Sequence, residues 1–207
     1  MKRVLVIVVT ILLAAISVAP AAADTVYSNL GKGGTFDDSV GYLVGGSMQV
    51  IAHQFTSGAD YTFTSAVLPL GIQSGNLITI QVYLEADSGG VPGDILEMIS
   101  VDVPFPWPGA QLVTAVSRQN PTLAAGTPYW LVAAGPGTDT VWDFNATGDL
   151  STGGNFAFNL VNSPTGPWMT LGDGFTRGAF EIGGDPLAAP APLRPSQGPP
   201  KSPLTAS

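Results

Sequence analysis

Cysteine is absent from this chain of 207 residues, and histidine occurs once, at position 53. Without thiols the chain cannot be held by disulfides, use a thiol nucleophile, carry a cysteine-linked lipid, or bind metal centres through sulfur. One histidine is too few for a histidine-rich zinc site. A Ser-His-Asp triad would have to use His53, and the Gly-x-Ser-x-Gly turn does not occur. His53 shares a strand face with Ile51 and Phe55, which favours a histidine of the core or sheet surface.

Basic residues are scarce as well. The chain has seven Lys and Arg against fifteen Asp and Glu, a formal net charge of −8. Lys2 and Arg3 lie in the apparent leader, so without it five basic residues remain and the net charge is about −10. Such an acidic chain repels phosphate backbones and anionic lipid surfaces. We therefore expect neither a nucleic acid nor an anionic membrane surface as a partner.

The first 23 residues have the three parts of a secretory signal peptide. Lys2 and Arg3 provide the positive start, Val4 to Val18 is an uncharged apolar run, and Ala21 to Ala23 offers the small residues that a signal peptidase reads. The alternative is a membrane anchor, but a span needs about 20 apolar residues and this run is shorter. The pattern predicts cleavage before Asp24 and a protein that is secreted or held at the cell surface, with no membrane span in the mature chain.

Short apolar segments punctuated by glycine and proline follow the leader, and no segment keeps a helical period. The clearest is 77–85, in which Ile78, Ile80, Val82 and Leu84 alternate with polar residues, the pattern of a half-buried strand. This organisation predicts an all-β fold, a single antiparallel β-sandwich of jelly-roll type over residues 24–184. The nine predicted strands are 48–55, 61–68, 77–85, 95–101, 112–117, 129–134, 141–145, 155–161 and 179–182.

Residues 185–207 differ in character from the rest of the chain. They are rich in Pro, Ala and Ser and contain few large apolar side chains. A segment of this composition buries too little surface to offset its ordering entropy. We expect a disordered tail.

Several stretches resemble the bacterial choice-of-anchor R domain family. They are TVYSNLG (25–31), LEADSGGVPGDILE (84–97), GTPYWLVA (126–133), WDFNATG (142–148), NFAFNLVNSPTGPWM (155–169) and FTRGAFEI (175–182). The resemblance implies an exported surface or extracellular module followed by a C-terminal sorting anchor, often of the PEP-CTERM type. The chain departs from that pattern at its end, because residues 190–207 contain no Pro-Glu-Pro and no apolar helix.

Two tryptophans lie in predicted loops and are candidates for ligand binding. Trp107 lies between prolines in PFPWP, and Trp168 follows SPTGP. A loop tryptophan offers a flat apolar face on which a sugar ring can stack. The alternative is that both side chains fold back and cap an open end of the sandwich. Trp130 and Trp142 lie in predicted strands, where we expect core residues.

Acidic residues suggest two further kinds of site. The loop from Asp87 to Asp94 combines carboxylates with glycine, as calcium sites do, although the same residues also form turns; it is the candidate site for a structural calcium. Glycoside hydrolysis needs two carboxyl groups, and the candidates are Glu85, Glu97, Glu181, Asp102 and Asp143. Glu85 and Glu181 lie on predicted strands and could form a pair across a concave sheet face. The alternative for this pair is a solvent-facing role on the polar side of each strand.

These observations favour a secreted, non-catalytic β-sandwich protein of the cell surface or extracellular matrix. Its expected partners are extracellular polysaccharide or components of the cell envelope, and apart from the candidate calcium we expect no cofactor. Two alternatives are a carbohydrate-active hydrolase that uses strand carboxylates and a purely structural surface protein.

Overall fold

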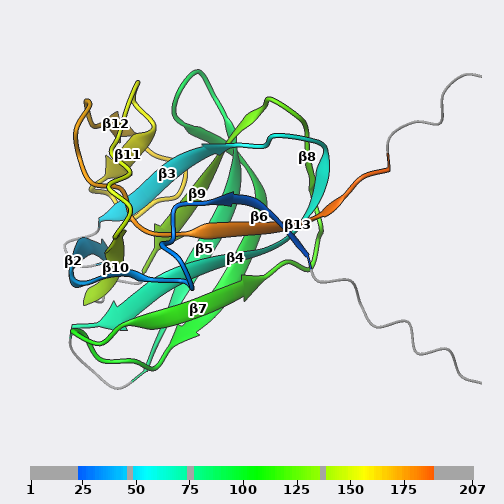
Figure 1. Ribbon diagram of the computed structural model, residues 1–207. Coiled ribbons are helices and arrows are strands. Elements are labelled where there is room, and N and C mark those ends of the chain that lie inside the picture. Colours follow the sequence, from blue (N-terminus) through cyan, green and yellow to red (C-terminus); the bar gives the residue numbers. More distant parts are fainter. Residues whose placement is uncertain (1–22, 46–48, 74–76, 136–138, 189–207) are drawn as a thin grey trace, which may run out of the picture.

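The computed structural model describes residues 23–45, 49–73, 77–135 and 139–188. Within these ranges the chain forms thirteen strands and no helix, so no helix there is long and apolar enough to cross a bilayer. The strands build two antiparallel sheets packed face to face (Figure 1). The predicted all-β, antiparallel β-sandwich is confirmed, and each of the nine predicted strands overlaps an observed one.

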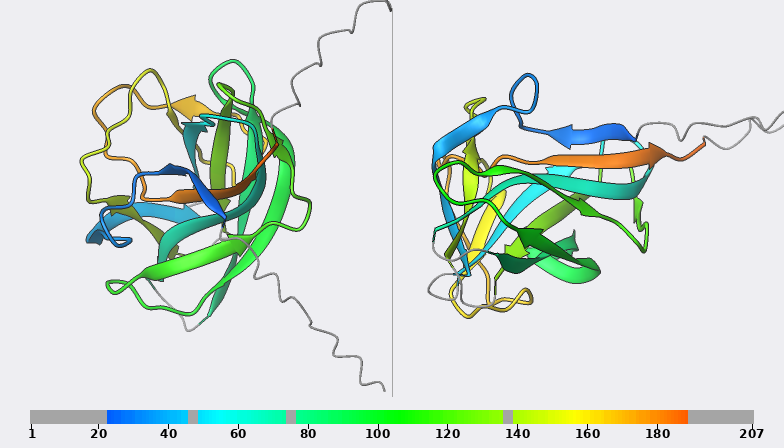
Figure 2. Two further views of the ribbon diagram at one scale, coloured as in Figure 1. Left: turned by 45° about the vertical axis from the view of Figure 1, so that its right-hand side comes forward. Right: turned by 90° about the horizontal axis from the view of Figure 1, so that it is seen from below.

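The first sheet is organised around one long strand. Its order is β1 (Asp24–Ser28), β13 (Glu181–Pro186), β4 (Tyr61–Ile72), β10 (Asp139–Asn145) and β2 (Phe36–Gly45). β13 and β10 pair with successive parts of one edge of β4, while β8 (Thr122–Leu123) and β7 (Gln111–Val116) pair with its other edge. Figure 2 shows β1 and β13 lying side by side along β4, although they are the first and the last strand in the sequence.

The second sheet has six strands. Their order is β12 (Met169–Thr170), β11 (Phe156–Asn159), β3 (Val50–Thr56), β9 (Pro128–Ala134), β5 (Ile78–Asp87) and β6 (Pro92–Val103). β6 and β7 are thus edge strands of different sheets, joined by the segment 104–110, which carries Trp107.

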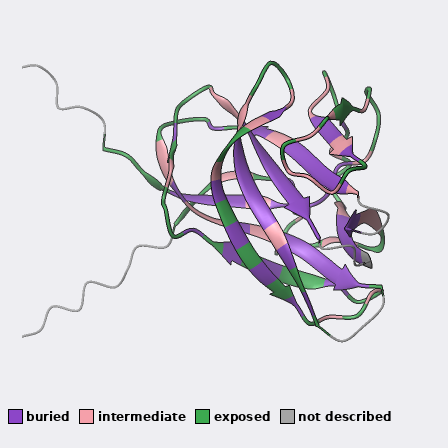
Figure 3. Ribbon diagram, turned by 180° about the vertical axis from the view of Figure 1, so that it is seen from behind, coloured by how far each residue is buried: buried purple, intermediate pink, exposed green. Residues whose placement is uncertain are grey.

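The main core lies between the sheets and follows the period-two alternation of the strands. On β5 the side chains of Ile78, Ile80, Val82 and Leu84 point into it, as the sequence predicts. Trp142 of β10 enters from the opposite sheet and is fully buried. Each Å² of apolar surface that is buried contributes about 25 cal/mol to stability, so this core is the main stabilising term in a fold without disulfides. Figure 3 shows that the central strands are buried along most of their length.

A second, smaller apolar cluster covers the outer face of the second sheet. It contains Tyr83, Trp130, Val132 and Ala52, and Trp168 packs against it. The outer face of β5 is therefore not simply polar: Tyr83 and Glu85 are buried. The connection between β11 and β12 contributes to this cover: its Trp168 packs against the cluster, and its Asn162 and Pro164 lie beside Tyr83.

The last strand extends two residues past the predicted domain end at 184. Asp185 pairs with Thr62 and Pro186 with Tyr61, and the Leu187 N–H donates to the carbonyl of Asp60 at 3.0 Å. The predicted start of the tail at 185 therefore lies inside a strand, because the free edge of β4 offers backbone partners there. The predicted signal peptide, apart from Ala23, and the tail beyond residue 188 lie outside the described residues.

Candidate functional site

Trp107 lies over the outer face of the first sheet. Its N–H donates to the carbonyl of Ile72 at 2.8 Å, and the N–H of Ile72 donates to Phe105 O at 2.7 Å, so the segment is tied to the end of β4. The approach is close, since a Cβ placed on Gly71 would lie 3.0 Å from Trp107 Cβ and 3.2 Å from Ala110 Cβ. A glycine at position 71 thus lets the tryptophan segment lie directly on the strand.

The Trp107 indole is held by a carboxylate of β10. Its Nε1–H donates to Oδ1 of Asp143 at 3.0 Å. Trp142 points into the core, so the alternation of the strand turns Asp143 to the outer face. Asp143 is fully buried there, and its Oδ2 has no hydrogen-bond partner. Burial raises the pKa of Asp143 to about 7; the Trp107 hydrogen bond opposes this rise, while the charges of Asp38 and Asp37 add to it.

An open pocket of about 300 Å³ lies beside this pair. Trp107 itself is half-buried, so part of its ring remains accessible. The pocket combines two aromatic side chains and an apolar floor with polar groups at its rim, the composition of small-molecule sites. Its lining residues are Ser39, Val40, Gly41, Leu43, Gln73, Trp107, Val141 and Phe144.

Trp168 lies on the other side of the molecule. It is half-buried against the outer apolar cluster of the second sheet, and its Nε1 is buried without a hydrogen-bond partner. The two candidate tryptophans therefore lie over the outer faces of different sheets and do not form one site. Trp168 covers a sheet face rather than an open end of the sandwich.

Asp87, predicted as a calcium ligand, accepts three hydrogen bonds from the protein. Its Oδ1 accepts from Gln54 Nε2 at 2.7 Å and Trp130 Nε1 at 2.8 Å, and its Oδ2 accepts from the Gly90 N–H at 3.1 Å. Asp94 is exposed on β6. In the described part of the chain no three His, Asp or Glu side chains gather as a metal site would require. Asp87 holds the loop and orients a core tryptophan.

The carboxyl groups of Glu85 and Glu181 do not converge. Glu85 is on β5, and its side chain lies on the outer face of the second sheet. Glu181 is on β13, next to the core residue Ile182, and so faces outward from the first sheet. Packed sheets are about 10 Å apart. The distance between two carboxyl groups on opposite outer faces therefore exceeds the separation of roughly 5 to 9.5 Å that glycosidases use.

Glu85 nevertheless has unusual surroundings. It is fully buried, and neither carboxylate oxygen has a hydrogen-bond partner. Burial raises its pKa to about 8, so the group is mostly protonated at neutral pH. Its neighbours across the sheet are Trp130 and Ile95, and Tyr83 precedes it on the same face.

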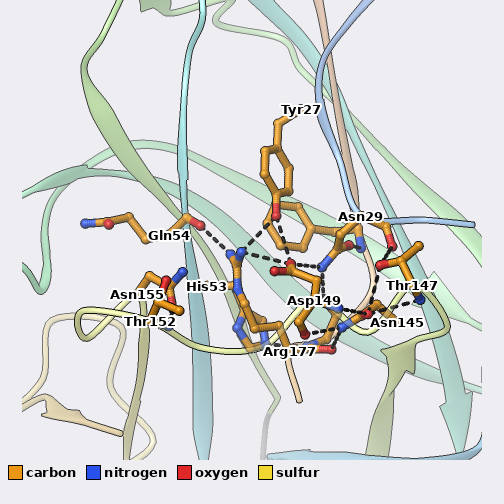
Figure 4. A network of polar contacts seen from close by, with 12 residues as sticks. Tyr27, Asn29, His53, Gln54, Asn145, Thr147, Asp149, Thr152, Asn155 and Arg177 are labelled. Carbon is orange, nitrogen blue, oxygen red and sulfur yellow. Dashed lines mark hydrogen bonds and ion pairs between the residues drawn. The ribbon is translucent and has the colours of Figure 1, made fainter. Parts of the chain in front are cut away.

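Arg177 is the centre of a buried polar network (Figure 4). Its Nη1 donates to the Tyr27 hydroxyl at 2.8 Å and to Asp149 Oδ2 at 3.0 Å, and its Nη2 donates to the carbonyl of Gln54. Asn145 Nδ2 donates to the carbonyls of Asp149 and Arg177 at 2.8 and 2.7 Å. These bonds join β1, β3 and two long loops, so the network has a structural role.

His53 lies in the core beside this network. Its Nε2 accepts the Gly178 N–H at 3.0 Å, and its ring packs against Trp142 and Phe156. Burial, together with the positive charge of Arg177, holds the His53 pKa well below its usual value. Its Nε2 partner is a backbone amide, not a serine hydroxyl. The predicted structural role of this histidine agrees with its position, and Trp130 and Trp142 are fully buried as predicted.

The sequence singles out Trp107, and it offers Asp143 only as a candidate catalytic carboxyl group, not as the partner of this tryptophan. Asp143 alternates with Trp142 in a predicted strand, a pattern that places a carboxyl group on the outer face. Nothing in the sequence indicates that the PFPWP segment, about 36 residues earlier, folds over that face.

No protein-family model matches the chain, and no curated protein matches it. The resemblance to the choice-of-anchor R domain family therefore stays a prediction that rests on its sequence stretches alone.

Proposed function

We propose that this chain is an exported, non-catalytic β-sandwich protein that binds polysaccharide at the cell surface or in the extracellular matrix, and that the Trp107 pocket is its binding site. The observation that carries the proposal is the Trp107 indole, half-buried and fixed by Asp143 at the edge of an open pocket. An indole held in one orientation offers its face to a ligand without first losing side-chain freedom.

The chemistry of the pocket suits a sugar ring. Sugars present apolar C–H faces, which stack on aromatic rings, and hydroxyl groups, which need polar partners. Trp107 and Phe144 supply the aromatic surface, and Ser39 and Gln73 supply hydroxyl and amide groups. A volume of about 300 Å³ is at the small end of ligand sites, which fits one or two rings of a longer chain.

A hydrolytic role has weaker support. The two glutamates considered as a pair face outward from different sheets. Asp143, which accepts the hydrogen bond of the Trp107 Nε1–H, is fully buried. A purely structural surface role remains the main competitor, and it predicts that no glycan binds.

A glycan array probed with the secreted chain tests the proposal. We expect binding that Trp107→Ala weakens about fivefold or more, because loss of an aromatic stacking face costs roughly 1 kcal/mol or more. Val116→Ala, which shortens an exposed side chain of β7, is the matched control and should bind normally. Near-UV circular dichroism checks that each variant keeps the native core.

The same experiment separates the alternatives. Loss of binding in Trp168→Ala, with Trp107→Ala unaffected, would move the site to the second sheet. Absence of binding to every glycan would favour the purely structural role.

A further inference from the structure

The surroundings of the Trp107 pocket carry negative charge. Asp37 and Asp38 are in β2 immediately before Ser39, which lines the pocket; Asp37 is half-buried, and Asp38 and Ser39 are exposed. Oδ1 of Asp37 accepts from the Ser39 N–H at 3.1 Å and its hydroxyl at 2.6 Å. These hydrogen bonds hold the pKa of Asp37 below its usual value, so this carboxylate is ionised near neutral pH.

A third carboxyl group, that of Asp143, lies next to the Trp107 side chain. Asp143 is buried on the outer face, with Oδ1 bonded to Trp107 and Oδ2 unpartnered. It is close enough to Asp37 and Asp38 for their charges to raise its pKa. An acceptor that is buried and lacks a donor is a polar group for which the chain itself supplies no partner.

Positive charge does not balance these groups. None of the residues that line the pocket is basic. Elsewhere in the described ranges, Arg177 is bonded to Asp149, Arg118 lines a groove between β6 and β7, and Lys32 lies in the turn before β2. The field at the pocket therefore comes mainly from carboxylates, in a chain whose net charge is already −8.

We infer that the Trp107 pocket selects glycans whose sugars carry a free amino group, and that it discriminates against acidic glycans. The inference rests on the proposed function and names the class of its ligand. An ammonium group is attracted by the carboxylates of Asp37 and Asp38, and it interacts favourably with the face of an indole. A uronate would add a further negative charge beside the carboxylates of Asp37 and Asp38.

Binding of four hexasaccharides with the same β-1,4 backbone tests this inference. They are built from glucosamine, N-acetylglucosamine, glucose and glucuronic acid, and calorimetry measures their dissociation constants. We expect the glucosamine oligomer to bind about five-fold more tightly than the two neutral ones, and the glucuronic acid oligomer to bind most weakly, since exposed pairs each add little. The preference should shrink as salt is added.

Two double variants show where the preference originates. Asp37→Asn with Asp38→Asn should reduce the preference for glucosamine to about two-fold or less, because it removes both carboxylates of β2 near the pocket. Asp24→Asn with Asp94→Asn removes the same net charge from exposed positions on other strands and should keep the preference. Equal loss in both variants would show a general charge effect and overturn the inference.

The results that would overturn the amino-sugar preference differ from those that would overturn the proposed polysaccharide binding. If binding depends on Trp107 but a neutral or acidic hexasaccharide binds as tightly as the glucosamine oligomer or more tightly, the amino-sugar preference is overturned. The proposal of polysaccharide binding then still stands. Binding of none of the four also overturns the inference, and the glycan array then decides separately whether the chain binds glycans at all.

Discussion

Trp107 donates its indole N–H to Oδ1 of Asp143 over 3.0 Å, which joins the segment between the two sheets' edge strands to the outer face of β10. The acceptor is a fully buried carboxyl group with a pKa of about 7. Because charge-assisted hydrogen bonds are stronger than neutral ones, the orientation of the indole is coupled to the protonation of this carboxyl group.

This coupling predicts a pH-dependent tryptophan signal. As pH rises through about 7, Asp143 loses its proton and the Trp107 bond strengthens, so we expect tryptophan emission to change with a midpoint near pH 7. Asp143→Asn should abolish the transition, since an amide does not titrate in this range. Trp168→Phe removes a tryptophan from the other sheet and should keep it. A transition that persists in Asp143→Asn would rule out this pair as its origin.

The sequence predicts the fold because the core strands alternate clearly. The segment 77–85 places four aliphatic residues on one face, and all four reach the core. β2 was missed because its sequence, FDDSVGYLVG, begins with acidic and small residues and is largely exposed over its first half. β8 and β12 have two residues each, too few to show a period.

The candidate site was predicted only in part, and the reason is physical. A loop tryptophan can be recognised from its proline-rich neighbours, but its partner is set by tertiary packing. The buried state of Glu85 was missed for the same reason. Its position on the outer face follows from alternation, whereas its burial depends on the outer apolar cluster, which includes its neighbours Tyr83 and Trp130.

Glu85 should make the protein less stable as pH rises. Its pKa is about 8 in the folded protein and 4.5 ordinarily. Below pH 4.5 both states hold the proton, whereas between 4.5 and 8 only the unfolded state releases it, so the free energy of unfolding falls across this window. Glu85→Gln cannot ionise and should escape this loss. Relative to the wild type, the free energy of unfolding of this variant should rise by about 4 kcal/mol between pH 4 and pH 8.

Urea unfolding at the two pH values measures the difference. The comparison across pH matters, because any fixed cost of placing an amide at position 85 is the same at both values. Glu181→Gln, at a partly exposed position, is the control for the general effect of removing one carboxylate. A stability difference for Glu85→Gln that does not change with pH would contradict a raised pKa.

Asp87 should stabilise the fold whether or not calcium is present. Asp87→Ala leaves the buried Trp130 Nε1 and the Gln54 amide without their acceptor, at a cost of about 2–4 kcal/mol for the two donors. Chemical denaturation in calcium and in EDTA should give the same loss. Asp94→Ala, at an exposed position, should change stability by less than about 0.5 kcal/mol. Calcium-dependent stability that both substitutions abolish would instead support a structural calcium in this loop.

Arg177 should be among the most costly residues to replace. It is 4% exposed, and the partner carboxylate of Asp149 is 28% exposed, so the pair is screened little by solvent. Arg177→Met keeps much of the side-chain volume but leaves Asp149, the Tyr27 hydroxyl and the Gln54 carbonyl without their common donor. We expect the free energy of unfolding to fall by about 3–5 kcal/mol, as when one partner of a buried pair is removed.

Two further variants separate charge from geometry. Arg177→Lys keeps the charge but cannot reach three acceptors with one ammonium group as the planar guanidinium does, so it should recover only part of the loss. Combining Arg177→Met with Asp149→Asn should cost less than the sum of the two single changes, because the second change removes the charge that the first leaves unpaired. Strict additivity would mean that the two residues stabilise the fold independently, and the network would then owe its stability to the Asn145 and Gln54 contacts instead.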